Sequence, residues 1–274
     1  MKKFLNIDKL ELSYNLDYEC KSKLESVNEL SFCNFTLIRK NNDSNYRNNF
    51  DIILVDSGLL FGTLYFGSYN VNRQKVYISV DNRILYSNDL LILSDIERKL
   101  NLELYSISKL DLALDFNYNI INKFYKLLKC EELEFIILNK KYSINDEISG
   151  LLNVSTGTRK NIHLFKSFYI NNREKGLSLT AYDKLKEIKD NDNTKSYISD
   201  LINSDKIFRL EIRTNHTLLK DSLSKLGYTD SYLHDIIINR INDELFELYR
   251  HLLSRLIRIS YNNNSYSLLN FLDK

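Results

Sequence analysis

The 274-residue sequence has no proline and no tryptophan, and only seven glycines, one methionine and three cysteines. Without proline, the turns must be formed mainly by Gly, Asn, Asp and Ser. The cysteines (Cys20, Cys33 and Cys130) are odd in number and widely spaced, and none belongs to a CxxC pair. This pattern argues against a zinc ribbon and against a disulfide framework, so we expect three reduced thiols.

The sequence also lacks long apolar runs and a strong charge of either sign. It has 38 Lys and Arg against 36 Asp and Glu, a net charge of +2. Strong nucleic-acid binders are often far more basic, so any contact with DNA must come from local patches. No apolar run reaches membrane-spanning length, and residues 1–8 lack the apolar stretch of a signal peptide. We therefore expect a cytoplasmic protein.

Several common catalytic motifs are missing as well. The four histidines form neither an HxH pair nor an HExxH motif, and there is no P-loop, GxGxxG or GxSxG. The basic turn at 157–160 is too short to be a phosphate-binding loop. These absences argue against zinc proteases, P-loop nucleotidases, dinucleotide-binding enzymes and α/β-hydrolases.

The hydrophobic pattern predicts an α+β fold with a mostly antiparallel central sheet flanked by helices. Alternating apolar residues predict strands over 4–14, 50–55, 59–66, 76–80, 110–116, 133–138, 162–170, 177–184 and 208–213. Apolar residues at three- and four-residue steps predict helices over 20–27, 88–100, 121–131, 197–203, 217–226 and 230–258. The strands at 162–170 and 177–184 are expected to form a hairpin. Residues 189–195 are expected to be a loop. Because the pattern turns all-helical near residue 216, we expect an α+β domain over 1–216 and a C-terminal helical segment over 217–274.

Two acids share one face of the predicted strand Leu110–Phe116. Successive strand side chains point to opposite faces, so Asp111, Ala113 and Asp115 lie together. Carboxylates on an otherwise apolar strand are costly to bury without partners. A hard divalent cation such as Mg²⁺ or Mn²⁺ is one such partner. Solvation, or pairing with Arg or Lys, is the alternative.

The predicted strand Phe208–Arg213 places Arg209, Glu211 and Arg213 on one face. Such an alternation is typical of a surface ladder of cross-strand ion pairs, and Glu211 is equally a candidate metal ligand. The residues alone leave both interpretations open.

Tyr182 shares a face of its predicted strand with Ser178, Thr180 and Lys184. A phenol is a poor nucleophile at pH 7, because its pKa is about 10. A nearby cation, either Lys184 or a metal, would favour the reactive phenolate. The chain has 19 tyrosines, so a structural role is the competing interpretation for any one of them.

Taken in order, three segments resemble the Rep_trans family of rolling-circle plasmid replication initiators. The family pattern is a strand of the form (R/K)LDLAxDF, then an arginine-containing hairpin ending in xxYxK, then a strand of the form xRxEI. The matching segments here are Lys109–Phe116, Tyr169–Lys184 and Phe208–Ile212. The resemblance covers about residues 75–215, because the strand and helix that precede the first motif also match.

The resemblance implies a metal-dependent nickase that cuts one DNA strand at an origin and transfers it through a 5′-phosphotyrosine link. It places the nucleophile on Tyr182 and the acids of the metal site, which would hold Mg²⁺ or Mn²⁺, on Asp111, Asp115 and Glu211. Lys184 is expected to assist catalysis. Basic residues expected to contact DNA are Arg173, Arg209 and Arg213.

The expected partners are origin DNA, both double-stranded and as a hairpin or single strand, and a host helicase. The apolar side of the C-terminal helix either joins a second copy of the chain in a homodimer or docks on the sheet. Two alternatives remain at this point. One is a relaxase of a conjugative or mobilisable element with the same chemistry, and the other is a non-catalytic DNA-binding protein at an origin or promoter.

Overall fold

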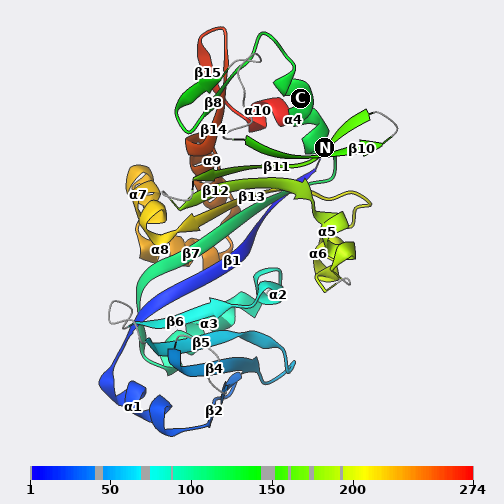
Figure 1. The fold of residues 1–274 in the computed structure, drawn as a ribbon. Helices are drawn as coiled ribbons and strands as arrows, with labels where there is room; N and C mark the ends of the chain where they lie inside the picture. Colours follow the sequence, from blue (N-terminus) through cyan, green and yellow to red (C-terminus); the bar gives the residue numbers. More distant parts are fainter. Residues whose placement is uncertain are drawn as a thin grey trace. The chain divides into compact units, whose positions relative to one another are not determined.

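A computed structural model describes residues 2–40, 46–68, 75–87, 89–142, 152–159, 162–172, 176–191 and 194–273. The chain forms two compact units, each built from segments that are distant in sequence (Figure 1). Unit 1 comprises Met1–Asn6, Asp111–Leu226 and Asn242–Lys274, and unit 2 comprises Ile7–Leu110 and Gly227–Ile241. Two long strands, β1 (Lys3–Leu16) and β7 (Leu102–Phe116), contribute residues to both units.

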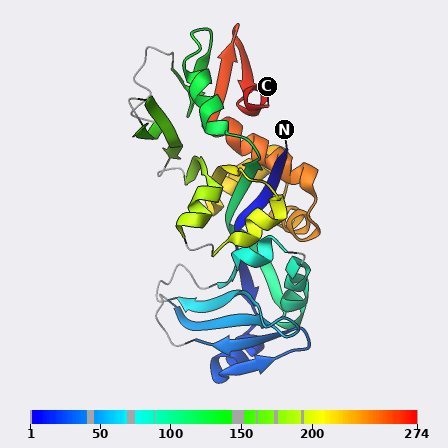
Figure 2. The ribbon, with the colours of Figure 1, turned by 90° about the vertical axis from the view of Figure 1, so that its right-hand side faces the viewer.

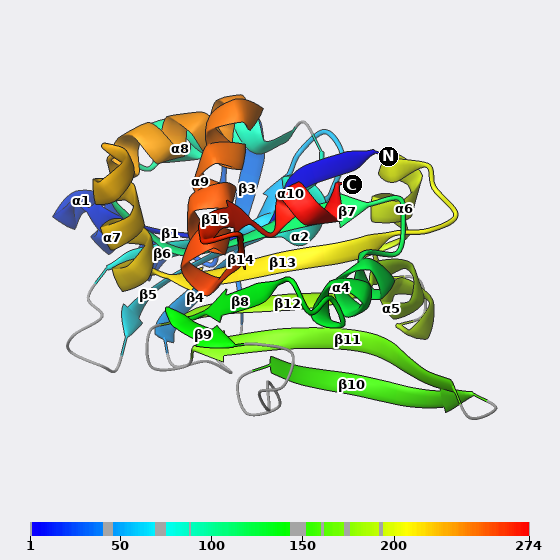
Figure 3. The ribbon, with the colours of Figure 1, turned by 90° about the horizontal axis from the view of Figure 1, so that it is seen from above.

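The sheet of unit 1 has the strand order β10–β11–β12–β13–β7–β1, and its first four strands are antiparallel neighbours. Figure 3 shows these four strands side by side. They are β10 (Leu152–Arg159), β11 (Ile162–Asn172), β12 (Leu177–Asp183) and β13 (Phe208–Asn215). The predicted hairpin of β11 and β12 is confirmed.

One face of this sheet is apolar and covered. In strand β12 the side chains of Leu177, Leu179 and Ala181 are buried, because every second residue points to this face. On the neighbouring strand β11, Phe168 stacks on Phe124 of α4 with 4.1 Å between ring centroids. The helices of unit 1 are α4 (Ile120–Leu128), α5 (Lys184–Asp190), α6 (Ser196–Ile202), α7 (His216–Leu226), α9 (Asn242–Leu256) and α10 (Leu269–Leu272).

A second, smaller antiparallel sheet also belongs to unit 1. Its strand order is β15–β14–β8–β9. These strands are β8 (Glu134–Ile137), β9 (Lys140–Tyr142), β14 (Ile257–Tyr261) and β15 (Asn264–Ser267). The small sheet thus pairs the end of the chain with a segment more than a hundred residues earlier.

The sheet of unit 2 has the strand order β7–β1–β6–β5–β4–β3–β2. Figure 2 shows this unit with α3 beside its strands. Its remaining strands are β2 (Glu29–Ser31), β3 (Phe35–Arg39), β4 (Tyr46–Leu54), β5 (Leu60–Ser68) and β6 (Val76–Val80). Its helices are α1 (Tyr18–Ser26), α2 (Asn82–Leu85), the 3₁₀ turn η1 (Asp89–Leu91), α3 (Ile92–Lys99) and α8 (Asp230–Asn239).

A polar cluster joins three elements in the core of unit 2. The hydroxyl of buried Tyr14 donates to Glu97 Oε1 at 2.7 Å, and His234 Nε2 lies 2.7 Å from the same oxygen. Glu97 belongs to α3 and His234 to α8, so both helices cover the same side of β1. The cluster explains how α8 is held in unit 2 although its neighbours in sequence belong to unit 1.

The predicted fold class is confirmed, since antiparallel sheets are flanked by helices in both units. The prediction of one helix over 230–258 is wrong. The helix ends at Asn239 because Arg240 adopts a left-handed conformation (φ 52°), and α9 starts at Asn242. Arg240 Nη2 donates to the carbonyl oxygens of Leu85 and Ser87, which fixes this break.

The last part of the predicted helical segment is a β-hairpin, formed by β14 and β15. Asn262 and Asn263 both have positive φ, 49° and 61°, as a type I′ hairpin turn requires. The change near residue 216 marks the passage from β13 to α7, and both of these elements belong to unit 1. No helix in the described part of the chain is long and apolar enough to cross a membrane.

Candidate active site

The face of β12 and β13 opposite the apolar one is polar. The two strands are paired so that Tyr182 is opposite Arg209 and Thr180 is opposite Glu211. Ser178 is likewise opposite Arg213. Because paired residues of neighbouring strands point to the same side, a phenol, a carboxylate and two guanidinium groups are brought together. The face predicted for each strand thus exists for these residues, and the pairing places the two faces on the same side of the sheet.

Glu211 connects the phenol to an exposed cation. The Tyr182 hydroxyl donates to Glu211 Oε2 at 2.9 Å, and Arg213 Nε donates to Glu211 Oε1 at 2.7 Å. The Glu211 side chain is 2% exposed, whereas that of Arg213 is 58% exposed. Tyr182 itself is partly exposed. A ligand in solvent can thus reach the Arg213 guanidinium, which shares Glu211 with the phenol.

Burial raises the pKa of Tyr182 above the ordinary phenol value, and it is the largest cause of the shift. The positive charge of Arg209 lowers this pKa, whereas the charges of Glu211 and Glu187 and the hydrogen bond to Glu211 raise it. Tyr182 is therefore a neutral phenol at pH 7, and the carboxylate that accepts its hydrogen bond is placed to take its proton.

Arg209 and Asp115 form a buried, two-point ion pair. Arg209 Nε donates to Asp115 Oδ1 and Arg209 Nη2 to Asp115 Oδ2, both at 2.7 Å, and both side chains are 0% exposed. Asn6 Nδ2 donates to Asp115 Oδ2 at 3.3 Å. Pairs of this kind are geometrically specific. This pair fixes the polar end of β7 against β13, beside Tyr182.

Lys184 differs from its prediction in position. Strand β12 ends at Asp183, whose side chain caps α5, so Lys184 is the first residue of that helix and not part of the strand. Its buried ammonium donates to Glu187 Oε2 at 2.6 Å and lies over the Tyr182 ring, 5.7 Å from the centroid. A cation at this distance interacts with the ring face. Arg173 lies outside the described residues.

The three acids do not fit the predicted metal site as they are arranged. Both oxygens of Asp115 accept hydrogen bonds from Arg209, and both oxygens of Glu211 are taken by Tyr182 and Arg213. Asp111 is nearly buried, and its charge acts on Arg213. Among the described residues there is no group of three His, Cys, Asp or Glu able to hold a metal ion. Asp115 thus follows the alternative interpretation, pairing with arginine.

Two contributors to this site were not predicted. Glu187 neutralises Lys184, and Asn6 donates a hydrogen bond to Asp115 in addition to those from Arg209. The position of Glu187, three residues after Lys184 on a helix, is a spacing at which side chains meet. Asn6 gives no comparable signal, because its contact joins residues 109 positions apart.

Neither a known sequence family nor any curated protein matches the chain. Among solved structures, the fold is similar to one described as a rolling circle replication initiator protein from Geobacillus stearothermophilus. The identity is 14% and the TM-score 0.50, over 99% of this chain and 96% of that one. A likeness at this identity concerns the fold, and it extends over essentially the full length of both chains.

Proposed function

We propose that this chain is a rolling-circle replication initiator that nicks and transfers a DNA strand through Tyr182. The hydrogen bond from the Tyr182 hydroxyl to Glu211, beside the exposed Arg213, is the observation that carries the proposal. Two further findings support it. The motifs occur in the order seen in the initiator family, and the fold is similar to a protein described as such an initiator.

In the proposed reaction Glu211 Oε2 takes the phenolic proton as the Tyr182 oxygen attacks the scissile phosphorus. The new O–P bond joins Tyr182 to the 5′-phosphate, and the bond to the 3′ oxygen breaks. That oxygen then takes up a proton to give a free 3′-hydroxyl. A positioned base removes the need for a free phenolate, which the raised pKa of Tyr182 makes rare at pH 7.

The two arginines have different parts in this proposal. Arg213 is exposed, and its guanidinium is able to bind the nonbridging phosphate oxygens, where negative charge develops. Arg209 is buried and committed to Asp115, so it positions the strands and lowers the pKa of Tyr182 without contacting DNA. Lys184 lies over the phenol ring, and its charge there is paired with that of Glu187.

Dependence on Mg²⁺ or Mn²⁺ stays a prediction from the family resemblance, and no step above passes through a metal. Addition of EDTA to the nicking reaction, followed by titration of each cation, tests it directly. Origin DNA is the proposed partner. A host helicase and a homodimer also remain predictions.

The test of the proposal is formation and mapping of the covalent adduct. Purified protein is incubated with supercoiled DNA that carries its own origin, and nicked circles and protein bound to the 5′ end are measured. The expected result is an adduct whose nuclease-trimmed nucleotide maps to the peptide containing Tyr182. An adduct on another tyrosine would contradict the assignment of the residue. Binding without any adduct would instead favour the non-catalytic DNA-binding protein.

A further inference from the structure

A second tyrosine lies on the polar face of the sheet in unit 1. Tyr169 of β11 is paired with Thr180 of β12, and Thr180 is two residues from Tyr182 on the same strand. Because paired residues, and every second residue of a strand, point to the same side of a sheet, Tyr169 and Tyr182 share a face. They are diagonal neighbours on strands that Figure 3 shows side by side. Such neighbours are about 7–8 Å apart, which is within reach of aromatic side chains.

The ring of Tyr169 is open to solvent. Its exposed fraction is 42%, whereas Phe168 and Ile170 on either side of it are buried. These two residues belong to the apolar face of the sheet, where Phe168 stacks on Phe124. Within the part of the chain that the structure describes, the Tyr169 side chain has no hydrogen-bond, ring or cation partner. The ring is therefore available to a ligand.

The face around Tyr169 has a charged part and a neutral part. Arg213 on β13 is an exposed cation. Ser167, Ser178 and Thr180, the neighbours of Tyr169 on this face, are half-buried and carry neutral hydroxyls. A single strand of nucleic acid has the same division, with a charged backbone and flat neutral bases. A protein partner fits less well, because the cores of protein interfaces are rich in apolar side chains and here hydroxyls surround one ring.

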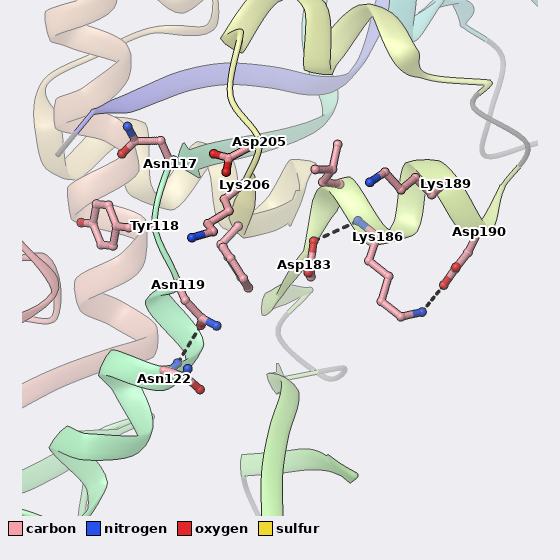
Figure 4. A pocket seen from close by; sticks show the side chains of 12 residues that line it. Asn117, Tyr118, Asn119, Asn122, Asp183, Lys186, Lys189, Asp190, Asp205 and Lys206 are labelled. Carbon is pink, nitrogen blue, oxygen red and sulfur yellow. Dashed lines mark hydrogen bonds and ion pairs between the residues drawn. The ribbon is translucent and has the colours of Figure 1, made fainter. Parts of the chain in front are cut away.

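A pocket at the end of β12 belongs to the other face of the sheet (Figure 4). Its lining includes Asp183 and Phe208, which are paired with each other across β12 and β13. Asp183 follows Tyr182 and Phe208 precedes Arg209, so strand alternation puts both on the side opposite the phenol. The pocket is thus not a site for a strand that reaches Tyr182, whereas Tyr169 lies on the same face as the phenol.

We propose that the Tyr169 ring stacks on an unpaired base of the DNA strand whose phosphate Tyr182 attacks. This inference rests on the proposed function, since it takes that strand to lie along the polar face. Aromatic side chains on antiparallel sheets of nucleic-acid-binding modules stack on unpaired bases. A base inside a duplex has both faces covered by its neighbours, so the contact selects an unpaired strand. Stacking tolerates every base, and Tyr169 therefore contributes affinity and positioning and not sequence preference.

The test measures binding without nicking, in the Tyr182→Phe background. The probes are two fluorescein-labelled single strands of equal length, oligo(dT) and a strand in which abasic sites replace every base. Fluorescence anisotropy is the readout. Tyr169→Ala should weaken binding of oligo(dT) by about 5- to 100-fold, and binding of the abasic strand by less than about twofold, because that strand has no base to stack. Tyr169→Phe keeps the ring and should bind both probes as the Tyr182→Phe protein does.

Tyr232→Ala is the matched control, because Tyr232 in unit 2 has the same exposed fraction of 42%. It should leave binding of both probes within about twofold. No effect of Tyr169→Ala on oligo(dT), or equal weakening of the two probes, would overturn the proposal. Loss of oligo(dT) binding in Tyr169→Phe would also overturn it, since the contact would then be the hydroxyl and not the ring. Failure of the proposed function has a different readout, which is the absence of an adduct between wild type and origin DNA.

Discussion

Each unit contains a tyrosine that donates to a glutamate held by a cation, and the two clusters differ in what surrounds the phenol. In unit 1, Tyr182 donates to Glu211, which Arg213 also binds. In unit 2, the Tyr65 hydroxyl donates to Glu11 Oε2 at 2.6 Å. Lys109 Nζ lies 3.0 Å from that same oxygen. A tyrosine–glutamate hydrogen bond is therefore not in itself the mark of a nucleophile.

The rings and their neighbouring charges distinguish the two clusters. Tyr65 packs against Tyr46 at 4.5 Å and Tyr77 at 5.4 Å between centroids, so its ring is fixed among other rings. Burial raises the pKa of Tyr65, and the hydrogen bond to Glu11 and the charge of Glu11 raise it further. Arg209 lowers the pKa of Tyr182, and Lys184 lies over its ring. The phenol of unit 1 thus has buried Arg209 and Lys184 beside it, and the exposed Arg213 bound to the same glutamate is the cation open to a ligand.

The largest expected effect comes from removing each hydroxyl. Tyr182→Phe should abolish the covalent adduct, a loss beyond about 10⁴-fold, because the attacking oxygen is gone. Tyr65→Phe removes the equivalent group in unit 2 and should leave the nicking rate within about threefold. Rates on supercoiled origin DNA measure both. Adduct formation by Tyr182→Phe would end the distinction between the two clusters.

The second largest difference is expected between variants of the two glutamates, Glu211 and Glu11. Glu211→Gln keeps the size of the side chain but removes the proton acceptor, so nicking should fall by about 10²–10⁴-fold. Glu11→Gln, the matched change in unit 2, should have little effect on the rate. Single-turnover nicking rates of wild type and Glu211→Gln at one pH are the measurement. A rate of Glu211→Gln within about threefold of wild type would assign Glu211 to structure alone.

The cations of the two clusters differ in burial. Replacing them should therefore lower the free energy of unfolding by different amounts. Arg209→Met leaves Asp115 buried without its partner, which should lower the free energy of unfolding by about 3–5 kcal/mol. Lys109→Met breaks the partly exposed pair with Glu11 and should cost less than about 1 kcal/mol. Urea unfolding measures both. Adding Asp115→Leu to Arg209→Met should recover much of the loss, and equal costs for the two single variants would contradict the burial argument.

The smallest expected effect is on the stability of the fold at alkaline pH. The folded-state pKa of Tyr65 and of Tyr182 is raised, so the stability that each contributes is fully present below about pH 10, the unfolded value. It is lost as pH rises toward the higher folded-state pKa, by at most about 1.4 kcal/mol per pH unit for each group. Replacing either tyrosine with Phe should make the decline between pH 9 and 11 shallower. A steeper decline in either variant would contradict the direction of the shift.

The sequence predicted the fold class and which side chains share a face within β12 and within β13, because strand alternation determines the latter. The partner of Asp115 depends on the pairing of β7 with β13, whose contacting residues are 94 positions apart, and local patterns do not determine it. The start of α5 had a signal in Asp183, a residue that often caps helices. No sequence signal predicted the left-handed conformation of Arg240, because that conformation depends on hydrogen bonds to carbonyl groups in unit 2.

The path of the chain through α8 has a consequence for protein engineering. The chain leaves unit 1 after Leu226, gives α8 to unit 2, and returns at Asn242. A fragment that stops at residue 226 would keep Glu97 but lose His234, its partner in the core of unit 2. Neither unit is thus a contiguous stretch that can be expressed alone. Independent production of unit 2 would require α8 to be reattached by a new linker after β7.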